Sequence, residues 1–256
     1  MKKLSFILLC VVLLTACSTQ KKTASSPEEI NVAAASDLTK SFQKIGKQFE
    51  KQTGIKVKFI FGASGELEAQ IENGAPYDVY AAANHTYVKK LKDKNLITAN
   101  SDKVYALGEI GVATRKDSKI QPADPDGLTS RQVKKIAIAN PKTAPYGMAA
   151  KQALQKAGIW DKVKDKLVYA KNISDTLTYV QSGNAEAGLV SHSLVQGEPV
   201  RYRMIDDSLY DPLQQTMAVV KNSKQQKAAQ KFCAFLTGPQ GKRILKQYGY
   251  AIPEGK

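Results

Sequence analysis

The sequence predicts an α/β fold of two lobes, each a mostly parallel sheet flanked by helices. From residue 30 onward, short apolar segments typical of strands alternate with longer amphipathic segments typical of helices. Such alternation indicates parallel strands covered by helices. The chain has 256 residues, and the part after residue 29 is longer than one small hydrophobic core needs.

The strand and helix patterns follow one another in the first part of the body. Strands are expected at 30–35, 55–61 and 78–82, and helices at 37–53 and 65–72. The helix at 37–53 is indicated by four apolar residues spaced by four, three and four positions, which share one helical face: Leu38, Phe42, Ile45 and Phe49. Gly54 follows as a helix stop.

The same rhythm recurs in the second part of the body. Strands are expected at 135–139, 167–169 and 187–190, and helices at 147–157 and 174–181. We place the first lobe at 30–107 plus 212–256, because the chain returns to it near Pro212, and the second lobe at 108–211. The two crossings would form a hinge.

The N-terminus predicts export. Lys2 and Lys3 precede an apolar run that is too short to span a membrane, followed by small residues, which is typical of a secretory signal over 1–16. The run ends in Leu14-Thr15-Ala16-Cys17. This segment resembles the lipobox of bacterial lipoproteins, which implies cleavage before Cys17 and lipidation of that residue. The polar stretch that completes 17–29 is expected to be a flexible tether.

The cysteine content limits the disulfides and metal sites that the chain can form. Of three cysteines, Cys10 would leave with the signal and Cys17 would be acylated, so we expect Cys233 to stay alone as a core residue without a disulfide. No Cys/His cluster suggests a metal cage.

The net charge of +15 is compatible with three kinds of ligand, which are nucleic acid, an anionic membrane and a small anion. Export and the absence of aromatic residues interleaved with the lysines argue against nucleic acid.

Four strand-to-helix turns are rich in small or polar residues, around Ser36, Ser64, Tyr146 and Ile173. Ligands of open parallel sheets gather at the carboxyl ends of strands, where the free N–H groups of helix N-termini favour an anion. The hydroxyls of Ser36 and Ser64 would add donors. Taken singly, each serine is also explained as an ordinary helix cap.

Several fragments resemble the periplasmic molybdate-binding proteins of ABC transporters. They occur in the family's order and spacing and span nearly the whole body: AAASDL (33–38), GASGELEAQIENGAPYDVYAAAN (62–84), NPKTAPYGMAAKQALQKAGIWDKV (140–163), NISDTLTYVQSGNAEAGLVS (172–191) and FLTGPQGKRILKQYGY (235–250).

The resemblance implies the type II periplasmic-binding-protein fold, with a ligand cleft between two lobes that close on a tetrahedral oxyanion. By motif position, Ser36 and Ser64 match two ligand serines. Tyr146 and Ile173 match residues that give backbone N–H groups. The fifth family ligand is commonly a tyrosine hydroxyl, and Ser191 stands at that position here. Ser191, a water molecule or a neighbouring residue would take its role.

The implied ligand is molybdate or tungstate, without a cofactor and without direct cation ligands. Asp37 and His192 are candidates for a supporting role. Asp37 would accept a hydrogen bond from a protonated phosphate, or it would simply be a carboxylate in the first helical turn that the helix dipole favours. His192, if it lines the cleft, would add positive charge below about pH 6.5 and tighten anion binding.

Other functions stay open at this point. The same fold would also hold sulfate, phosphate, chromate or a ferric chelate. An extracytoplasmic hydrolase is the rival from another class, but Glu66 replaces the second glycine of a nucleophile elbow around Ser64. The sequence therefore predicts a monomeric, non-enzymatic binding protein, held outside the cytoplasm by its lipid, whose partner is the permease of an ABC importer.

Overall fold

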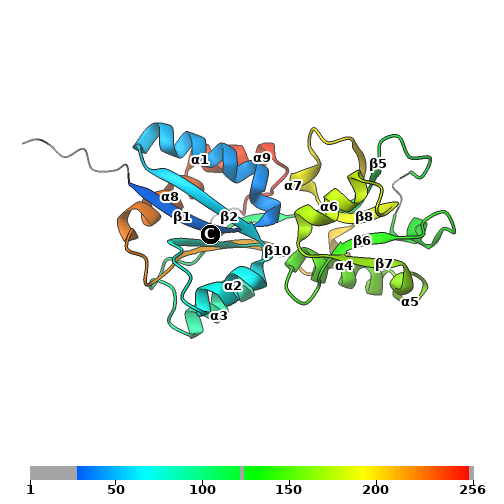
Figure 1. Ribbon diagram of the computed structural model, residues 1–256, viewed down its shortest axis with the longest axis horizontal. Coiled ribbons are helices and arrows are strands. Elements are labelled where there is room, and N and C mark those ends of the chain that lie inside the picture. The colour runs from blue at the N-terminus through cyan, green and yellow to red at the C-terminus, as the bar shows by residue number, and fades with distance from the viewer. Residues whose placement is uncertain (1–27, 122–123, 254–256) are drawn as a thin grey trace, which may run out of the picture.

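A computed structural model describes residues 28–121 and 124–253. The predicted signal, Cys17 and most of the predicted tether lie outside these residues. Two five-stranded sheets, each with helices on both faces, lie one after the other along the long axis of the molecule (Figure 1). No helix in the described ranges combines the length and hydropathy needed to cross a bilayer. The predicted α/β fold of two lobes is confirmed.

The first sheet has the strand order β2-β1-β3-β10-β4. Strand β1 pairs in parallel with β2 and β3, whereas β10 is antiparallel to β3 and β4. The strands are β1 (Glu29–Ala35), β2 (Lys56–Gly62), β3 (Val79–Ala82), β4 (Lys103–Gly108) and β10 (Leu213–Val219). One face is covered by α1 (Thr39–Thr53), α8 (Gln226–Thr237) and α9 (Pro239–Gln247), and the other by α2 (Ser64–Glu72) and α3 (His85–Asp93).

The second sheet has the order β7-β6-β8-β5-β9. Strand β6 is parallel to β7 and β8, and β5 is antiparallel to β8 and β9. The strands are β5 (Ile110–Arg115), β6 (Ile136–Ala139), β7 (Leu167–Ala170), β8 (Ala187–Ser191) and β9 (Val200–Met204). The helices are α4 (Pro145–Lys156), α5 (Trp160–Val163), α6 (Ile173–Gln181) and α7 (His192–Val195).

The chain passes twice between the sheets. It leaves the first sheet at Gly108 and enters the second at Ile110, and it returns between Met204 and Leu213. We call the first sheet with its helices lobe 1 and the second lobe 2. The exact domain boundaries drawn from the sequence stay predictions.

The start of the first helix differs from the prediction. A short 3-10 helix, Ser36–Leu38, precedes α1, and α1 then ends at Gly54 with a φ of 72°. This left-handed conformation suits glycine, which explains the stop. The buried face of α1 carries Phe42, Ile45 and Phe49, as the spacing predicted.

Cys233 packs from α8 against the core of lobe 1 and is partly buried. Burial raises the pKa of its thiol to about 12. The thiol is therefore protonated at neutral pH and inert, because thiolate is the reactive form.

Gly147 gives a test of the packing between α4 and β6. A Cβ at this position would lie 2.1 Å from the backbone oxygen of Ala139, which cannot move without shifting the strand. Glycine to alanine within a helix normally stabilises by about 1 kcal/mol, but Gly147→Ala should destabilise by about 1–3 kcal/mol because of this overlap. Urea unfolding measures the difference. Gln155→Ala, at an exposed position of the same helix, is the control and should change stability by less than about 0.5 kcal/mol. A more stable Gly147→Ala variant would contradict the packing.

Candidate functional site

The four predicted turns meet between the two lobes. At the first, the Ser174 hydroxyl of α6 donates to the Ser36 carbonyl at 2.8 Å, and the Ser174 N–H approaches the Ser36 Oγ at 3.4 Å. At the second, the Gly65 N–H at the start of α2 donates to the Thr143 carbonyl at 2.8 Å, just before α4. Each lobe 1 turn therefore touches a lobe 2 turn.

Ser36 and Ser64 are not helix caps. Ala35 and Ala63 occupy the capping positions, and each serine is the first residue of its helix without a capping hydrogen bond from its side chain. The Ser64 Oγ instead accepts from the Ala83 N–H at 3.0 Å. An accepting hydroxyl still has its own proton to donate. The two buried hydroxyls are therefore free to serve an anion, although their contact with a ligand stays a prediction.

Tyr146 and Ile173 occupy helix positions suited to donating backbone N–H groups. Tyr146 is the second residue of α4, after Pro145, and Ile173 is the first residue of α6. The first N–H groups of a helix have no acceptor within that helix and carry the positive end of its dipole. The positions thus fit the donor roles that the resemblance implied.

The side chain of Ser191 forms hydrogen bonds with other residues of the protein. Its side chain is fully buried at the end of β8. Its Oγ lies 2.7 Å from the Ser193 Oγ and accepts from the Ser193 N–H at 3.3 Å. Ser193 in turn donates to the Asp37 carbonyl at 2.8 Å. Ser191 therefore belongs to a hydrogen-bond chain that ends at Asp37, and its direct contact with an anion stays a prediction.

Asp37 is the centre of the contact between the lobes. Its Oδ2 accepts from the Tyr250 hydroxyl at 2.8 Å, the Gln215 amide at 2.8 Å and the Tyr146 hydroxyl at 3.1 Å. Tyr250 and Gln215 belong to lobe 1, whereas Tyr146 belongs to lobe 2. The carboxylate is fully buried and lies in the first turn of the 3-10 helix, so it has these hydrogen bonds in addition to its place at a helix dipole. Asp37 joins the lobes.

Burial also changes the acidity of this carboxyl group. Removal from water raises the pKa of Asp37 to about 6, although hydrogen bonds from Tyr250, Tyr146 and Gln215 act in the opposite direction. Among the described residues, Asp37 Oδ1 has no hydrogen-bond partner. A proton on Oδ1 would leave all three donors on Oδ2 in place.

His192 lies beside a carboxylate. Its Nδ1 is 3.1 Å from Oε2 of Glu109, and its ring stacks on Tyr202 at a centroid distance of 5.3 Å. A positive charge on His192 would be balanced by Glu109. The proposed effect of His192 on anion affinity stays a hypothesis, and this pairing would reduce it.

The residues that surround Asp37 could not be recognised in the sequence. Gln215 comes from β10 and Tyr250 from the segment after α9, so neither is near Asp37 in the sequence. Ser193 and Ser174 were seen only as neighbours of other residues. No spacing pattern links positions that far apart, because only the crossing of the chain between lobes brings them together.

The described residues contain no group of three or more His, Cys, Asp or Glu side chains placed to hold a metal ion. The turns between the lobes present hydroxyl and N–H donors. Such donors can hold an anion by charge-assisted hydrogen bonds.

Comparisons with known proteins agree with this architecture. The family model described as "Bacterial extracellular solute-binding protein" matches residues 30–251. The molybdate-binding protein ModA of Azotobacter vinelandii is 36% identical over 235 residues, which is 90% of this chain and 92% of that protein. A putative ABC transporter substrate-binding lipoprotein of Bacillus subtilis, YvgL, is 29% identical and covers 93% of both chains.

A solved structure shows the same fold. The periplasmic molybdate-binding protein of Azotobacter vinelandii superposes with a TM-score of 0.83 at 28% identity, covering 88% of this chain and all of that one. The two-lobed fold and these matches define a solute-binding protein, which is a transport component and not an enzyme. The chain belongs to the bacterial extracellular solute-binding protein family, and the resemblance to its molybdate-binding members is confirmed.

The raised pKa of Asp37 predicts how stability depends on pH. Between about pH 4 and pH 6 the folded protein holds a proton that the unfolded chain, with a pKa near 3.8, has released. The stabilisation from this proton is complete below pH 4 and is lost as the pH rises through 6. Two pKa units correspond to about 3 kcal/mol.

Asp37→Asn removes this titration and keeps an acceptor for the three donors. Without ligand, the melting temperature of the variant relative to wild type should therefore rise between pH 5 and pH 7.5. Thermal unfolding at several pH values measures this difference. A difference that is constant with pH would show that Asp37 does not titrate in this range.

Proposed function

We propose that this protein captures molybdate or tungstate outside the cytoplasm and delivers the anion to an ABC importer. The observation that carries the proposal is the meeting of four turns between the lobes. Two of them offer the hydroxyls of Ser36 and Ser64, and two offer the helix N-termini at Tyr146 and Ile173. The printed names of the relatives support the choice of ligand.

The anion would be held without a counter-charge. Each charge-assisted hydrogen bond contributes about 1.5–3 kcal/mol. Several such bonds, less the cost of ordering and closure, leave about −8 to −11 kcal/mol, which is micromolar to nanomolar affinity. A site that contains only hydrogen-bond donors favours a fully deprotonated dianion. A protonated phosphate has an O–H group of its own, which needs an acceptor in the site. Sulfate is smaller and would fit such a cavity less well.

Delivery requires that the lobes open and close. The contacts between the lobes include Ser174 with Ser36, Tyr146 with Asp37, and Lys40 with Glu198 at 2.5 Å, and we infer that they belong to a closed form. An anion that touches both lobes would favour this closed form over an open one. The opened protein would release the anion to the permease.

A lipid on Cys17 would keep the protein at the membrane. The Leu-Thr-Ala-Cys segment supports this anchor, and the Bacillus subtilis relative is itself named a lipoprotein. The permease of an ABC importer is the proposed partner, since that relative is also named for an ABC transporter.

Ligand identity is tested by thermal shift with molybdate, tungstate, sulfate, phosphate and chromate. Molybdate and tungstate should each raise the melting temperature, because binding to the folded state alone adds about 2.7 kcal/mol at a hundredfold excess over Kd. Sulfate and phosphate should have little effect. No stabilisation by either molybdate or tungstate would overturn the proposal.

The site itself is tested by the double variant Ser36→Ala/Ser64→Ala. Loss of two hydroxyl donors should weaken molybdate binding at least a hundredfold, at about 1.5–3 kcal/mol per bond, and leave the fold intact. Isothermal titration calorimetry measures the affinity, and circular dichroism checks the fold. Ser182→Ala, at an exposed serine after α6, is the control. Retained affinity in the double variant would place the site elsewhere.

The role of closure is tested by a matched pair of tyrosines. Tyr146→Phe removes a hydrogen bond between the lobes, so molybdate affinity should fall about tenfold, the equivalent of one bond to a charged group. Tyr250→Phe removes a bond to the same Asp37 oxygen within lobe 1. It should lower stability and change affinity by less than about threefold, since its bond to Asp37 lies within lobe 1. Equal losses of affinity would contradict the proposed role of Tyr146 in closure.

A further inference from the structure

The helices on one face of lobe 1 carry almost only positive charge. Helices α1, α8 and α9 contain nine Lys or Arg residues and one acidic residue, Glu50. Helices α2 and α3, on the opposite face of the same sheet, contain three Lys and four acidic residues. The positive charge of lobe 1 is therefore concentrated on one side.

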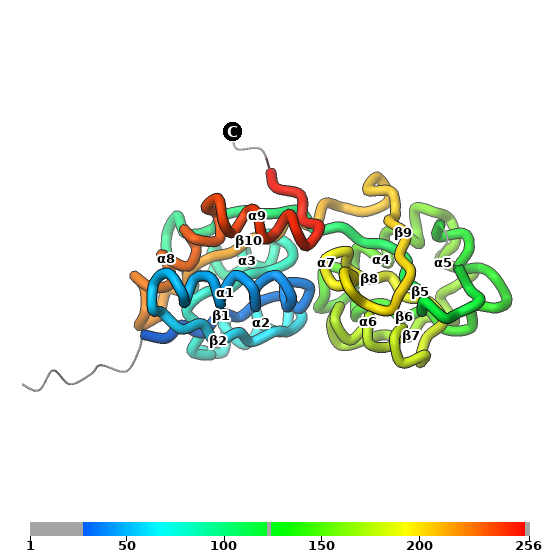
Figure 2. The backbone as a smooth tube through the Cα atoms, turned by 90° about the horizontal axis from the view of Figure 1, so that it is seen from above, coloured from blue at the N-terminus to red at the C-terminus, as the bar shows by residue number. Residues whose placement is uncertain are grey.

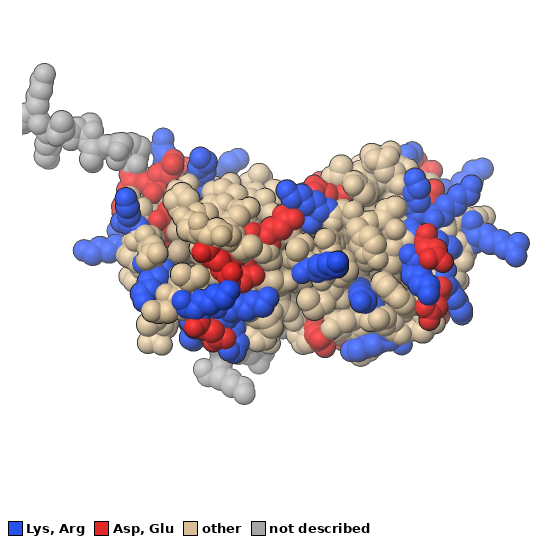
Figure 3. Space-filling model, turned by 60° about the horizontal axis from the view of Figure 1, so that its bottom comes forward, with Lys and Arg blue, Asp and Glu red and all other residues tan. Residues whose placement is uncertain are grey.

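The lysines of the two sides also differ in their partners. On α3, Lys89 pairs with Asp93 at 2.7 Å and Lys92 pairs with Asp102 at 2.8 Å. Figure 3 shows this side of the molecule, where basic and acidic side chains are mixed. Among the described residues, Lys40 alone of the nine cations on α1, α8 and α9 has a carboxylate within 4.0 Å. The other eight are exposed.

The three helices form one continuous layer. Lys44 of α1 donates to Gln247 of α9 at 2.9 Å, and Gln52 of α1 donates to Gln240 at 2.8 Å, so the two helices run side by side in opposite directions. Helix α8 packs beside both (Figure 2). We call the outer surface of α1, α8 and α9 the basic layer.

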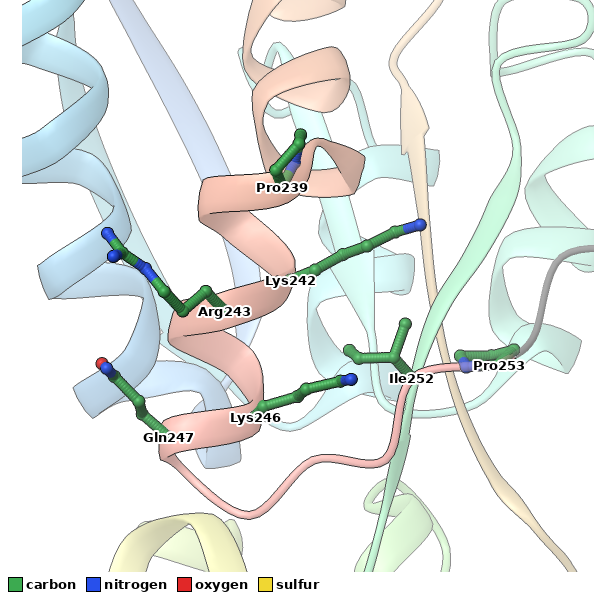
Figure 4. A pocket seen from close by; sticks show the side chains of 7 residues that line it. All are labelled: Pro239, Lys242, Arg243, Lys246, Gln247, Ile252 and Pro253. Carbon is green, nitrogen blue, oxygen red and sulfur yellow. The ribbon is translucent and has the colours of Figure 1, made fainter.

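One edge of the basic layer combines charge with apolar surface. Lys242 and Lys246, one turn apart on α9, point into a hollow of about 730 Å³ (Figure 4). Ile252 and Pro253 line its other side. Ammonium groups next to apolar side chains match the boundary between lipid headgroups and acyl chains, where long basic side chains place their stems in apolar surroundings and their charges at phosphate.

We propose that the basic layer is a docking surface for a bilayer that contains anionic phospholipids. Each Lys or Arg near such a surface contributes about 1 kcal/mol to the free energy of membrane binding. A layer of eight cations without a carboxylate partner among the described residues is therefore sufficient for reversible binding. The chain enters lobe 1 at Glu29, and the twelve residues from Cys17 span at most about 40 Å. If Cys17 is lipidated, as the proposed function has it, lobe 1 stays within reach of the bilayer. The attraction between the basic layer and anionic phospholipids depends neither on that lipid anchor nor on the oxyanion.

A lipid surface fits these cations better than an acidic protein does. Tight protein interfaces depend on buried aromatic or arginine residues that fill pockets. The basic layer offers seven lysines and one arginine, all exposed. Mobile lysines suit a fluid array of phosphate groups, which rearranges to meet them.

The test uses the full chain with Cys17→Ser, which prevents acylation, and co-flotation with phosphatidylcholine vesicles with or without phosphatidylglycerol. The Cys17→Ser protein with no other change should bind the vesicles only when they contain phosphatidylglycerol, and this binding should weaken as the salt concentration rises. The variant Lys47→Glu/Lys51→Glu/Lys242→Glu/Lys246→Glu should weaken this binding by about a thousandfold, at about 1 kcal/mol for each of the four residues.

The matched control replaces four exposed lysines of lobe 2 by glutamate, so that the net charge changes by the same amount: Lys116→Glu/Lys119→Glu/Lys134→Glu/Lys162→Glu. It should lose less than about threefold, because charges away from the bilayer are screened. Equal losses in the two variants, or binding without preference for phosphatidylglycerol, would overturn the proposal. Vesicle binding that is insensitive to the basic-layer variant would also overturn it, because another surface of the protein would then be binding the lipid. Molybdate-dependent thermal shifts, measured on the same samples, test the proposed function separately.

Discussion

The buried carboxylate of Asp37 is the interaction on which the closed arrangement depends. It stands next to Ser36, at the point where β1 gives way to the first helical turn, and receives hydrogen bonds from both lobes. A buried carboxylate without such donors would be strongly unfavourable. One of these donors, the Tyr146 hydroxyl, belongs to lobe 2. The energy of this one group is therefore tied to the position of the lobes.

The same arrangement explains how an anion could be held so near a carboxyl group. The Asp37 carboxylate uses protein donors at Oδ2, and its raised pKa brings the neutral form within reach near pH 6. The hydroxyls of Ser36 and Ser64 and the N-termini of α4 and α6 then stay available for a ligand. In the proposed function, closure and anion capture would reinforce each other, because each brings donors of lobe 2 to lobe 1.

The sequence predicted most of the local structure and little of the contact between the lobes. The apolar spacing of Phe42, Ile45 and Phe49 was enough to place α1, because one helix buries one face. The four turns could be recognised because strands end at the same edge of a sheet. Ser36 and Ser64 could not be told from ordinary caps, since only the fold shows that Ala35 and Ala63 take the capping positions. Gln215, Ser193 and Tyr250 were beyond prediction, because they reach Asp37 only through the crossing of the chain between lobes.

The location of a bound molybdate is the most direct test of the central claim. Crystals grown with molybdate would give an anomalous signal from molybdenum. Our account predicts one strong peak between the lobes, within hydrogen-bond reach of the Ser36 and Ser64 hydroxyls and of the backbone N–H groups of Tyr146 and Ile173, with Asp37 still bonded to Tyr146. A peak at any other place, or closed lobes with no molybdenum between them, would contradict it.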